Sequence, residues 1–202
     1  MVRKNLGVPG PLVGVRRVFG VPTFTIDGQP FMTPVFETYR PHYEDFAQFA
    51  RAGSKVFSFN TNAARCDYGN SPQPTWPRPC EWNYSELDER VHRVLGADAN
   101  ALIMPRVYIG TPDWWLEQNP EELLVLDGGE TFYTSGNTFP QNRPYPCIAS
   151  KKWRKDMGYA RKHLIEHIQS SDYGEHIFGY IIAGLNTEEW YHWSSGIEQL
   201  SD

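Results

Sequence analysis

Two adjacent carboxylates, Glu188 and Glu189, are the residues of this sequence best suited to acid–base chemistry. They follow an apolar run, Ile177 to Leu185, with Asn186 before them and Trp190 after them. A carboxyl group beside an aromatic wall is desolvated, which favours its protonated form and suits a general acid. The same spacing also fits a helix N-terminus, where Asn186 caps the helix and the glutamates face its dipole.

Polar and aromatic residues also follow the other apolar runs of the chain. They are Glu37 and Arg40 after the first run, Asn60 and Asn62 after the second, and Arg106, Tyr108, Trp114 and Trp115 at or after the third. Such groups converge on one pocket when they lie at the carboxyl ends of parallel strands. Purely structural roles are the alternative. Arg106 could pair with a buried acid such as Glu37, and the two tryptophans could pack against loops.

A different chemistry is suggested by His163, Glu166 and His167, which match the H-x-x-E-H pattern of some zinc proteases. Histidines four residues apart share one face of a helix, as zinc coordination requires. However, this helix already carries an apolar stripe that must pack on the sheet, and both histidines flank that stripe. We therefore expect no metal site and keep a zinc hydrolase only as a third hypothesis.

The elements that must position these residues alternate between strand and helix. Asp27-Gly28 suits a type I′ turn and predicts a hairpin of residues 21–26 and 29–31. Strands are expected at 34–39, 55–60, 101–109 and 177–185, and helices at 42–52, 85–95 and 151–169. Pro105 predicts a bulge or strand end, Ser150 caps the last helix, and the run 177–185 fits a strand buried on both faces.

This order predicts a parallel α/β sheet with right-handed crossovers. A doubly wound sheet and a (β/α)8 barrel both fit the order. The long loops 66–83 and 110–150 follow strand ends, where barrel enzymes build their sites. No Gly-x-Gly-x-x-Gly follows the first strand, so the dinucleotide-binding alternative lacks its main support. We therefore expect the TIM-barrel architecture.

Composition restricts the class of protein and its partners. A chain of 202 residues with 40% hydrophobic residues can build one core. Its net charge of −5 argues against nucleic acid, and no apolar run approaches the roughly 20 residues that span a bilayer. Three cysteines leave at least one unpaired, and no apolar run follows Arg3 and Lys4 as in a signal peptide, so we expect a cytoplasmic protein.

Four segments together resemble the N-terminal half of clan A retaining glycoside hydrolases, close to the family 42 β-galactosidases. They are FTIDGQPF, FARAGSKVFSFNTN, PRVYIGTPDWWLEQNP and GYIIAGLNTEEW. The resemblance implies the first four βα units of a (β/α)8 barrel over residues 21–202, preceded by an extension over residues 1–20. It also implies a retaining β-glycosidase that acts on carbohydrate without a cofactor, and a homo-oligomer.

The resemblance also assigns roles to residues at the strand ends. Family members place Asn directly before the acid/base Glu, whereas here Asn186 is followed by Thr187. Glu189 lies next to the aromatic Trp190, so we prefer it as acid/base, with Glu188 standing where the Asn should be. Glu188 is the alternative if Asn-x-Glu is a bulged variant, and Asn186 would orient a sugar hydroxyl. Glu37, Arg40, Asn60, Asn62, Arg106 and Tyr108 would line the sugar pocket, and Trp114, Trp115 and Trp193 would stack on sugar faces.

Retaining hydrolysis needs two carboxyl groups about 5 Å apart, one to protonate the leaving oxygen and one to attack the anomeric carbon. The family's second carboxylate follows the seventh strand, and four strands are predicted here by Leu185. We therefore expect a fragment that is inactive by itself. The alternative is a non-catalytic carbohydrate-binding protein on a degenerate half barrel.

Overall fold

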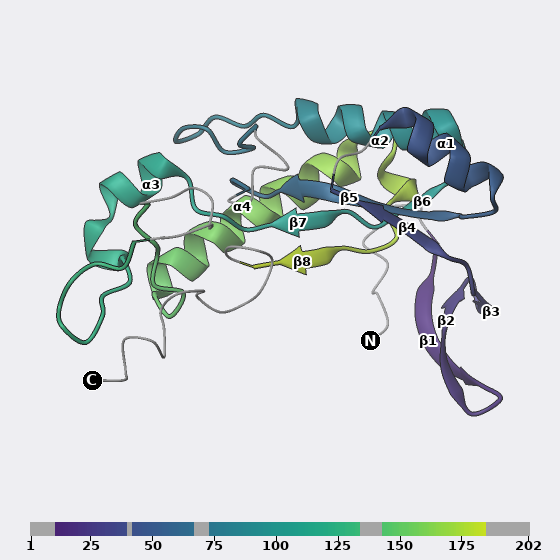
Figure 1. The fold of residues 1–202 in the computed structure, drawn as a ribbon, viewed down its shortest axis with the longest axis horizontal. Helices are drawn as coiled ribbons and strands as arrows, with labels where there is room; N and C mark the ends of the chain where they lie inside the picture. Colours follow the sequence, from purple (N-terminus) through teal and green to yellow (C-terminus); the bar gives the residue numbers. More distant parts are fainter. Residues whose placement is uncertain (1–10, 40–41, 67–72, 134–142, 185–202) are drawn as a thin grey trace. The chain divides into compact units, whose positions relative to one another are not determined.

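The computed structural model shows a mixed α/β protein with a parallel sheet (Figure 1). It describes residues 11–39, 42–66, 73–133 and 143–184. The chain divides into two compact units. The first holds Met1–Phe59, Leu87–Pro105 and Glu166–Ile181, and the second holds Asn60–Glu86, Arg106–Ile165 and Ile182–Asp202.

The sheet follows the predicted order of strands along the chain. β4 (Val35–Thr38), β5 (Val56–Asn62), β7 (Arg106–Tyr108) and β8 (Ile181–Ala183) lie in the order β4-β5-β7-β8, and β6 (Leu102–Ile103) also pairs with β5. The pairs that β5 makes with β4, β6 and β7 are parallel. The α/β prediction is confirmed, and closure into a barrel stays a prediction.

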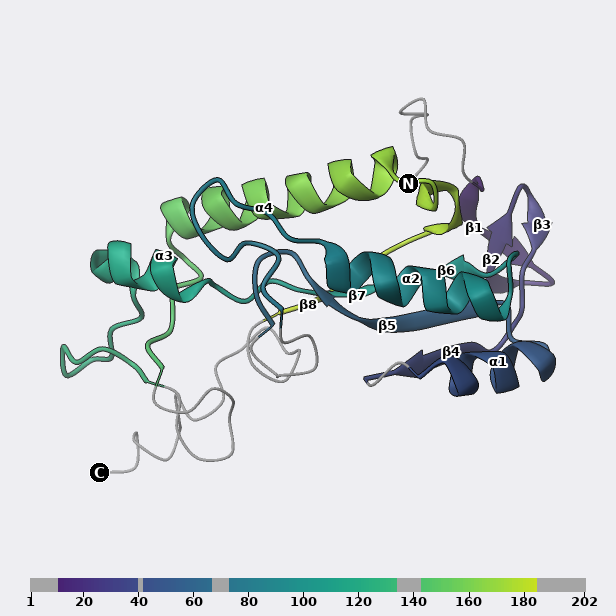
Figure 2. The same ribbon diagram turned by 90° about the horizontal axis from the view of Figure 1, so that it is seen from above.

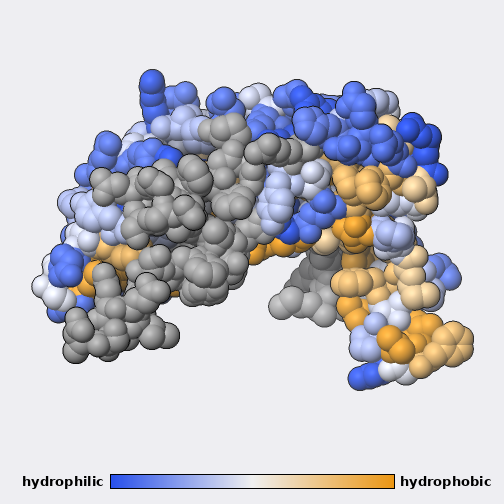
Figure 3. All heavy atoms as spheres, in the orientation of Figure 1, coloured by the Kyte–Doolittle hydropathy of each residue, from blue (hydrophilic) through white to orange (hydrophobic). Residues whose placement is uncertain are grey.

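A three-stranded antiparallel meander precedes the parallel sheet. Its strands are β1 (Val13–Val18), β2 (Val21–Ile26) and β3 (Gln29–Pro30). Asp27 and Gly28 have φ of 50° and 80° at the predicted turn, as a type I′ turn requires. β1 was not predicted and lies in the expected N-terminal extension. Val15 and Phe24 pair across β1 and β2 with 63% and 60% exposure, and Figure 3 shows the apolar surface of the meander.

Two helices of the first unit, α1 (Tyr43–Arg51) and α2 (Ser85–Ala97), lie near where they were predicted (Figure 2). Phe46 of α1 is fully buried, with its ring 5.8 Å from that of Phe57 on β5. Phe49 is 44% exposed and stacks on Phe36 of β4 at 3.9 Å. These aromatic contacts hold α1 against the edge of the sheet formed by β4 and β5.

The long loop after β7 contains α3 (Asp113–Gln118) and a 3-10 turn, η1 (Pro120–Glu122), and a second turn, η2 (Gly174–His176), precedes β8. α4 (Lys151–Ser170) is the longest helix. The Ser150 hydroxyl accepts a hydrogen bond from the Trp153 backbone N–H at 2.9 Å, which confirms the predicted cap. Among the described helices, none has a stretch apolar and long enough to cross a bilayer.

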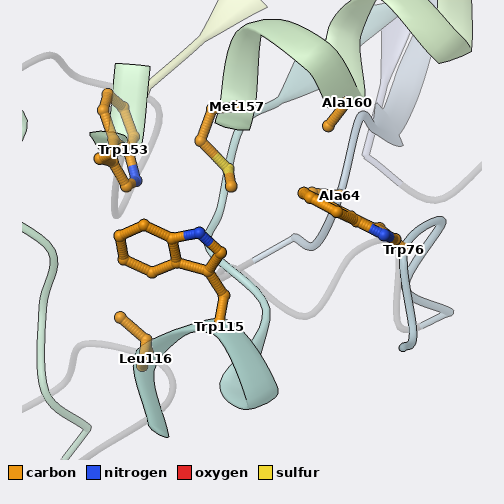
Figure 4. Close-up of a cluster of buried hydrophobic side chains, with 7 residues drawn as sticks. All are labelled: Ala64, Trp76, Trp115, Leu116, Trp153, Met157 and Ala160. Atoms are coloured by element: carbon orange, nitrogen blue, oxygen red, sulfur yellow. The ribbon is translucent and has the colours of Figure 1, made fainter. Parts of the chain in front are cut away.

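The predicted apolar stripe of α4 is buried and contributes to the main core cluster of the second unit. Figure 4 shows Trp153 and Met157 of α4 beside Trp115 of α3, whereas Ala160 lies on the other side of the same cluster. The indole N–H of Trp153 donates to the Thr111 hydroxyl at 2.7 Å. This hydrogen bond satisfies a polar group that burial would otherwise leave without a partner.

Three predicted strands differ from the observed ones. β5 continues two residues further, to Asn62. The expected strand at 101–109 is split into β6 and β7 at Pro105, because proline has no N–H to donate to the ladder. The run 177–185 forms only the three residues of β8 in the described part, and Ile182 is 40% exposed. The prediction that this strand is buried on both faces is therefore wrong.

Candidate functional site

The ends of β5 and β7 bring four of the predicted site residues side by side. In the parallel register, Asn60 pairs with Arg106 and Asn62 pairs with Tyr108. Residues paired in register project to the same face of a sheet. The loops that follow these strands also meet, because the Gly110 N–H donates to the Arg65 carbonyl at 2.9 Å. The second unit thus contains a polar end of the sheet with its two loops joined.

Asn62 is fully buried and holds the loop that follows β5. Its amide nitrogen donates to the Gln73 carbonyl at 3.0 Å. Its amide oxygen accepts from the backbone N–H and the hydroxyl of Thr75, at 3.0 and 3.1 Å. The structure therefore gives Asn62 an anchoring role for residues 73–75.

Two other predicted site residues lie in the interior. Tyr108 is fully buried in a cluster with Cys66 and Ala183. Trp115 is 1% exposed, and its indole N–H donates to the Asp156 carboxylate at 2.8 Å. Neither ring lines the hollow at the strand ends, and the burial of Trp115 agrees with the loop-packing alternative. Asn60 is also buried, with 1% exposure.

Trp114 lies closer to the surface and borders a small hollow. Its indole N–H donates to the Trp76 carbonyl at 3.1 Å, and the two rings meet edge to face at 4.8 Å. The hollow measures about 80 Å³ and is lined by Arg65, Pro74, Trp76, Pro77, Pro112, Asp113 and Trp114. We call it the strand-end hollow.

Arg65 and Asp113 form the polar wall of the strand-end hollow, and Arg143 pairs with Asp113 from outside the lining. Asp113 accepts hydrogen bonds from Arg65 and from Nε of Arg143, the latter at 2.7 Å. Burial raises the pKa of Asp113, but the two guanidinium groups outweigh burial and hold this pKa below its ordinary value. Asp113 is therefore ionised at neutral pH, so it accepts hydrogen bonds from hydroxyl groups and has no proton to donate.

The sequence prediction missed Arg65 and Asp113, which line this site, and Arg143, which pairs with Asp113. A signal was present for two of them, since Arg65 comes three residues after Asn62 and Asp113 directly precedes Trp114. No local signal marks Arg143, which lies 30 residues after Asp113. Its side chain is 6% exposed and also donates to the Thr111 carbonyl.

The remaining predicted site residues are Glu37, which does not line the strand-end hollow, and five residues outside the described chain. Glu37 belongs to the first unit, is exposed, and accepts a hydrogen bond from the Ser58 hydroxyl at 3.2 Å. The residues that lie outside the described ranges are Arg40, Asn186, Glu188, Glu189 and Trp193.

The histidines of the H-x-x-E-H pattern have other partners. Nε2 of His163 lies 2.9 Å from the Tyr159 hydroxyl, and the ring stacks on Trp82 at 4.2 Å. Nε2 of His167 lies 2.7 Å from the Asp88 carboxylate. Within the described ranges, no three His, Cys, Asp or Glu side chains are grouped to hold a metal ion. Cys66, Cys80 and Cys147 are free thiols.

The chain matches no protein-family model and no curated protein sequence. Among solved structures, it is similar to a β-galactosidase from the psychrophilic Marinomonas ef1, with a TM-score of 0.49 and 14% identity. The match covers 76% of this chain and 21% of the β-galactosidase, so the chain spans about a fifth of that protein's length.

Proposed function

We propose that this chain binds carbohydrate at the strand-end hollow, as part of a retaining β-glycosidase. The observation that carries the proposal is the position of Trp114 beside the ion pair of Asp113 with Arg65 at the ends of two parallel strands. An aromatic ring offers a flat apolar surface for the C–H face of a sugar. The charged groups beside it offer hydrogen bonds to sugar hydroxyls. In barrel enzymes, this end of the sheet is where substrate binds.

The proposed catalytic group is Glu189, with Glu188 as the alternative. As acid/base, Glu189 would protonate the leaving oxygen and then deprotonate the attacking water. Asn186 would orient the sugar, and Trp193 would stack on it. In the family that the sequence resembles, the nucleophile follows the seventh strand, so we assign it to no residue of this chain. The mechanism needs no cofactor.

A second candidate function is carbohydrate binding without turnover. The strand-end hollow itself supports binding only, because its carboxylate, Asp113, is kept ionised by two arginine partners. An ionised carboxylate fixed in this way binds hydroxyl groups but cannot act as a general acid. Under this alternative the protein would recognise a sugar and release it unchanged.

Binding is tested by titrating the chain with galactose, lactose and glucose while tryptophan fluorescence is recorded. We expect saturable binding of at least one sugar, weakened about tenfold or more in Trp114→Ala, because an aromatic contact contributes on the order of 1 kcal/mol beyond area burial. Phe19→Ala is the matched control, since Phe19 is fully exposed on the meander. No binding by the wild-type chain, or equal weakening in both variants, would refute the proposed site.

Turnover is tested with p-nitrophenyl β-D-galactopyranoside on a full-length parent protein that supplies the nucleophile after the seventh strand, and on its Glu188→Gln and Glu189→Gln variants. Release of p-nitrophenol that is lost in Glu189→Gln and largely kept in Glu188→Gln supports the glycosidase. The opposite pattern transfers the acid/base role to Glu188. Sugar binding with no release from the parent protein supports the second candidate.

A further inference from the structure

A second hollow, of about 220 Å³, lies along α4 in the second unit. It is lined by Ile109, Ile148, Trp153, Arg154, Met157 and Arg161, and we call it the α4 hollow. None of these residues lines the strand-end hollow. An inference about the α4 hollow is therefore independent of the proposed carbohydrate function.

The floor of the α4 hollow is apolar. Trp153 is 5% exposed and Met157 is 1% exposed. The only polar atom of the Trp153 side chain already donates to Thr111, so its ring presents carbon to the hollow. An apolar cavity of about 150 Å³ holds benzene. The α4 hollow therefore has room for an aromatic group that carries a substituent.

The rim of the α4 hollow is cationic. Arg154 and Arg161 are seven residues apart on α4, which places them on the same side of the helix, two turns apart. In the described part of the chain, neither guanidinium pairs with a carboxylate; Arg154 makes one long hydrogen bond of 3.4 Å to the Ile148 carbonyl. Two guanidinium groups at an apolar hollow are suited to a planar anion, because each can donate two parallel hydrogen bonds.

The charge of α4 as a whole supports an anionic ligand. The helix carries six lysines and arginines and two acids, in a chain whose net charge is −5. Lys151 and Lys152 lie in the first turn, where cations are unfavourable because the helix dipole is positive at that end. Lys152 is compensated by Asp156 at 2.7 Å. Arg154 and Arg161 have no such carboxylate partner in the described ranges.

We propose that the α4 hollow binds an aromatic carboxylate or sulfonate. The aromatic group would lie on Trp153 and Met157, and the anionic group would accept hydrogen bonds from Arg154 and Arg161. The apolar floor selects the ring and the cationic rim selects the charge, so a neutral aromatic compound of the same shape would bind more weakly.

The test is isothermal titration calorimetry of the full chain with 2-naphthoate and with neutral 2-naphthamide. We expect 2-naphthoate to bind at one site, and 2-naphthamide to bind about tenfold more weakly, because a charged group strengthens hydrogen bonds to arginine. In the double variant Arg154→Gln/Arg161→Gln, the affinity for 2-naphthoate should fall to that for 2-naphthamide. Lys151→Gln/Lys155→Gln is the matched control, since it removes the same charge from α4 without touching the hollow.

A further control must exclude binding of 2-naphthoate to the exposed apolar surface of the meander. Phe24 lies on that surface, paired with Val15 of β1, and Arg16 and Arg17 follow on the same strand. Phe24→Ser should leave the affinity for 2-naphthoate within twofold of the wild-type value. Circular dichroism of each variant establishes that it is folded. The proposal is overturned if the wild-type chain does not bind 2-naphthoate, if both double variants weaken it equally, or if Phe24→Ser removes binding.

Discussion

Asp113 accepts a hydrogen bond from Nε of Arg143 at 2.7 Å, although 30 residues separate the two in the chain. The Asp113 side chain is more than half exposed, whereas the Arg143 side chain is 6% exposed. The arginine is thus the buried member of the pair. This relationship ties the loop after β7 to the segment that precedes α4.

Replacing Asp113 should destabilise the protein. Asp113→Asn removes the negative charge that the buried Arg143 guanidinium contacts through Nε, and we expect the free energy of unfolding to fall by about 2 kcal/mol. Urea denaturation at pH 7 measures this change. Glu117→Gln on the exposed side of α3 is the control and should change stability by less than about 0.5 kcal/mol. Equal effects of the two variants would show that the ion pairs of Asp113 add no stability.

The protein should lose stability in acid through aspartates whose pKa lies below the ordinary value. A hydrogen bond from Lys55 lowers the pKa of Asp98. For Asp113, burial raises the pKa, but Arg143 and Arg65 lower it by more than burial raises it, so the pKa lies below its ordinary value. The unfolded chain binds protons more readily than the folded one, so this stability is present above about pH 4 and is lost as pH falls below it.

The measurement is the urea midpoint between pH 2 and pH 7 for the wild-type chain and for Asp113→Asn. Removing the carboxylate removes its share of the proton linkage, so the variant should have the shallower decline below about pH 4. If the urea midpoint falls equally steeply below about pH 4 in the two proteins, the lowered pKa of Asp113 is contradicted.

Asn62 should contribute to the free energy of unfolding through the hydrogen bonds that its side chain makes. Asn62→Ala removes three hydrogen bonds and leaves the buried N–H of Thr75 without its acceptor, so we expect a loss of about 2–4 kcal/mol. Amide hydrogen exchange should show faster exchange at Thr75. Asn100→Ala, at an exposed position, should leave both measurements near their wild-type values. If Asn62→Ala changes neither the free energy of unfolding nor the exchange at Thr75, the anchoring role is refuted.

Asp88 should hold Tyr173 in its protonated form. Its carboxylate accepts hydrogen bonds from the Tyr173 hydroxyl and from His167, and Tyr173 is 2% exposed. Burial and Asp88 together raise the pKa of Tyr173, so this tyrosine should not ionise below about pH 11 while the chain is folded. Ultraviolet absorbance titration of the wild-type chain and of Tyr173→Phe should therefore show the same number of ionising tyrosines below that pH.

Asp88→Ala should also lower the free energy of unfolding by about 2 kcal/mol, because the buried Tyr173 hydroxyl loses its acceptor. Glu89→Ala is the control, since the partner of Glu89 within the described ranges is Arg93, in an exposed ion pair. Its effect should stay below about 0.5 kcal/mol. In the ultraviolet titration, one fewer ionising tyrosine in Tyr173→Phe than in the wild-type chain would refute the raised pKa of Tyr173.

The sequence by itself determined the features that depend on neighbours in the chain. The Asp27-Gly28 turn, the Ser150 cap and the period of the α4 stripe are set within a few residues, because turn geometry and helical periodicity are local properties. The alternation of strands and helices was enough to predict the parallel sheet. Strand ends were less certain, as Pro105 and Ile182 show.

Only the tertiary structure decided which polar and aromatic residues face the site. Asn62, Tyr108 and Trp115 have residue types that suit sugar binding, yet all three are buried and support the loops. Asp113 meets Arg65 across 48 positions and Arg143 across 30. Residue type and local spacing cannot predict such distant contacts, because burial and ion pairing arise only when the folded chain brings separate segments together.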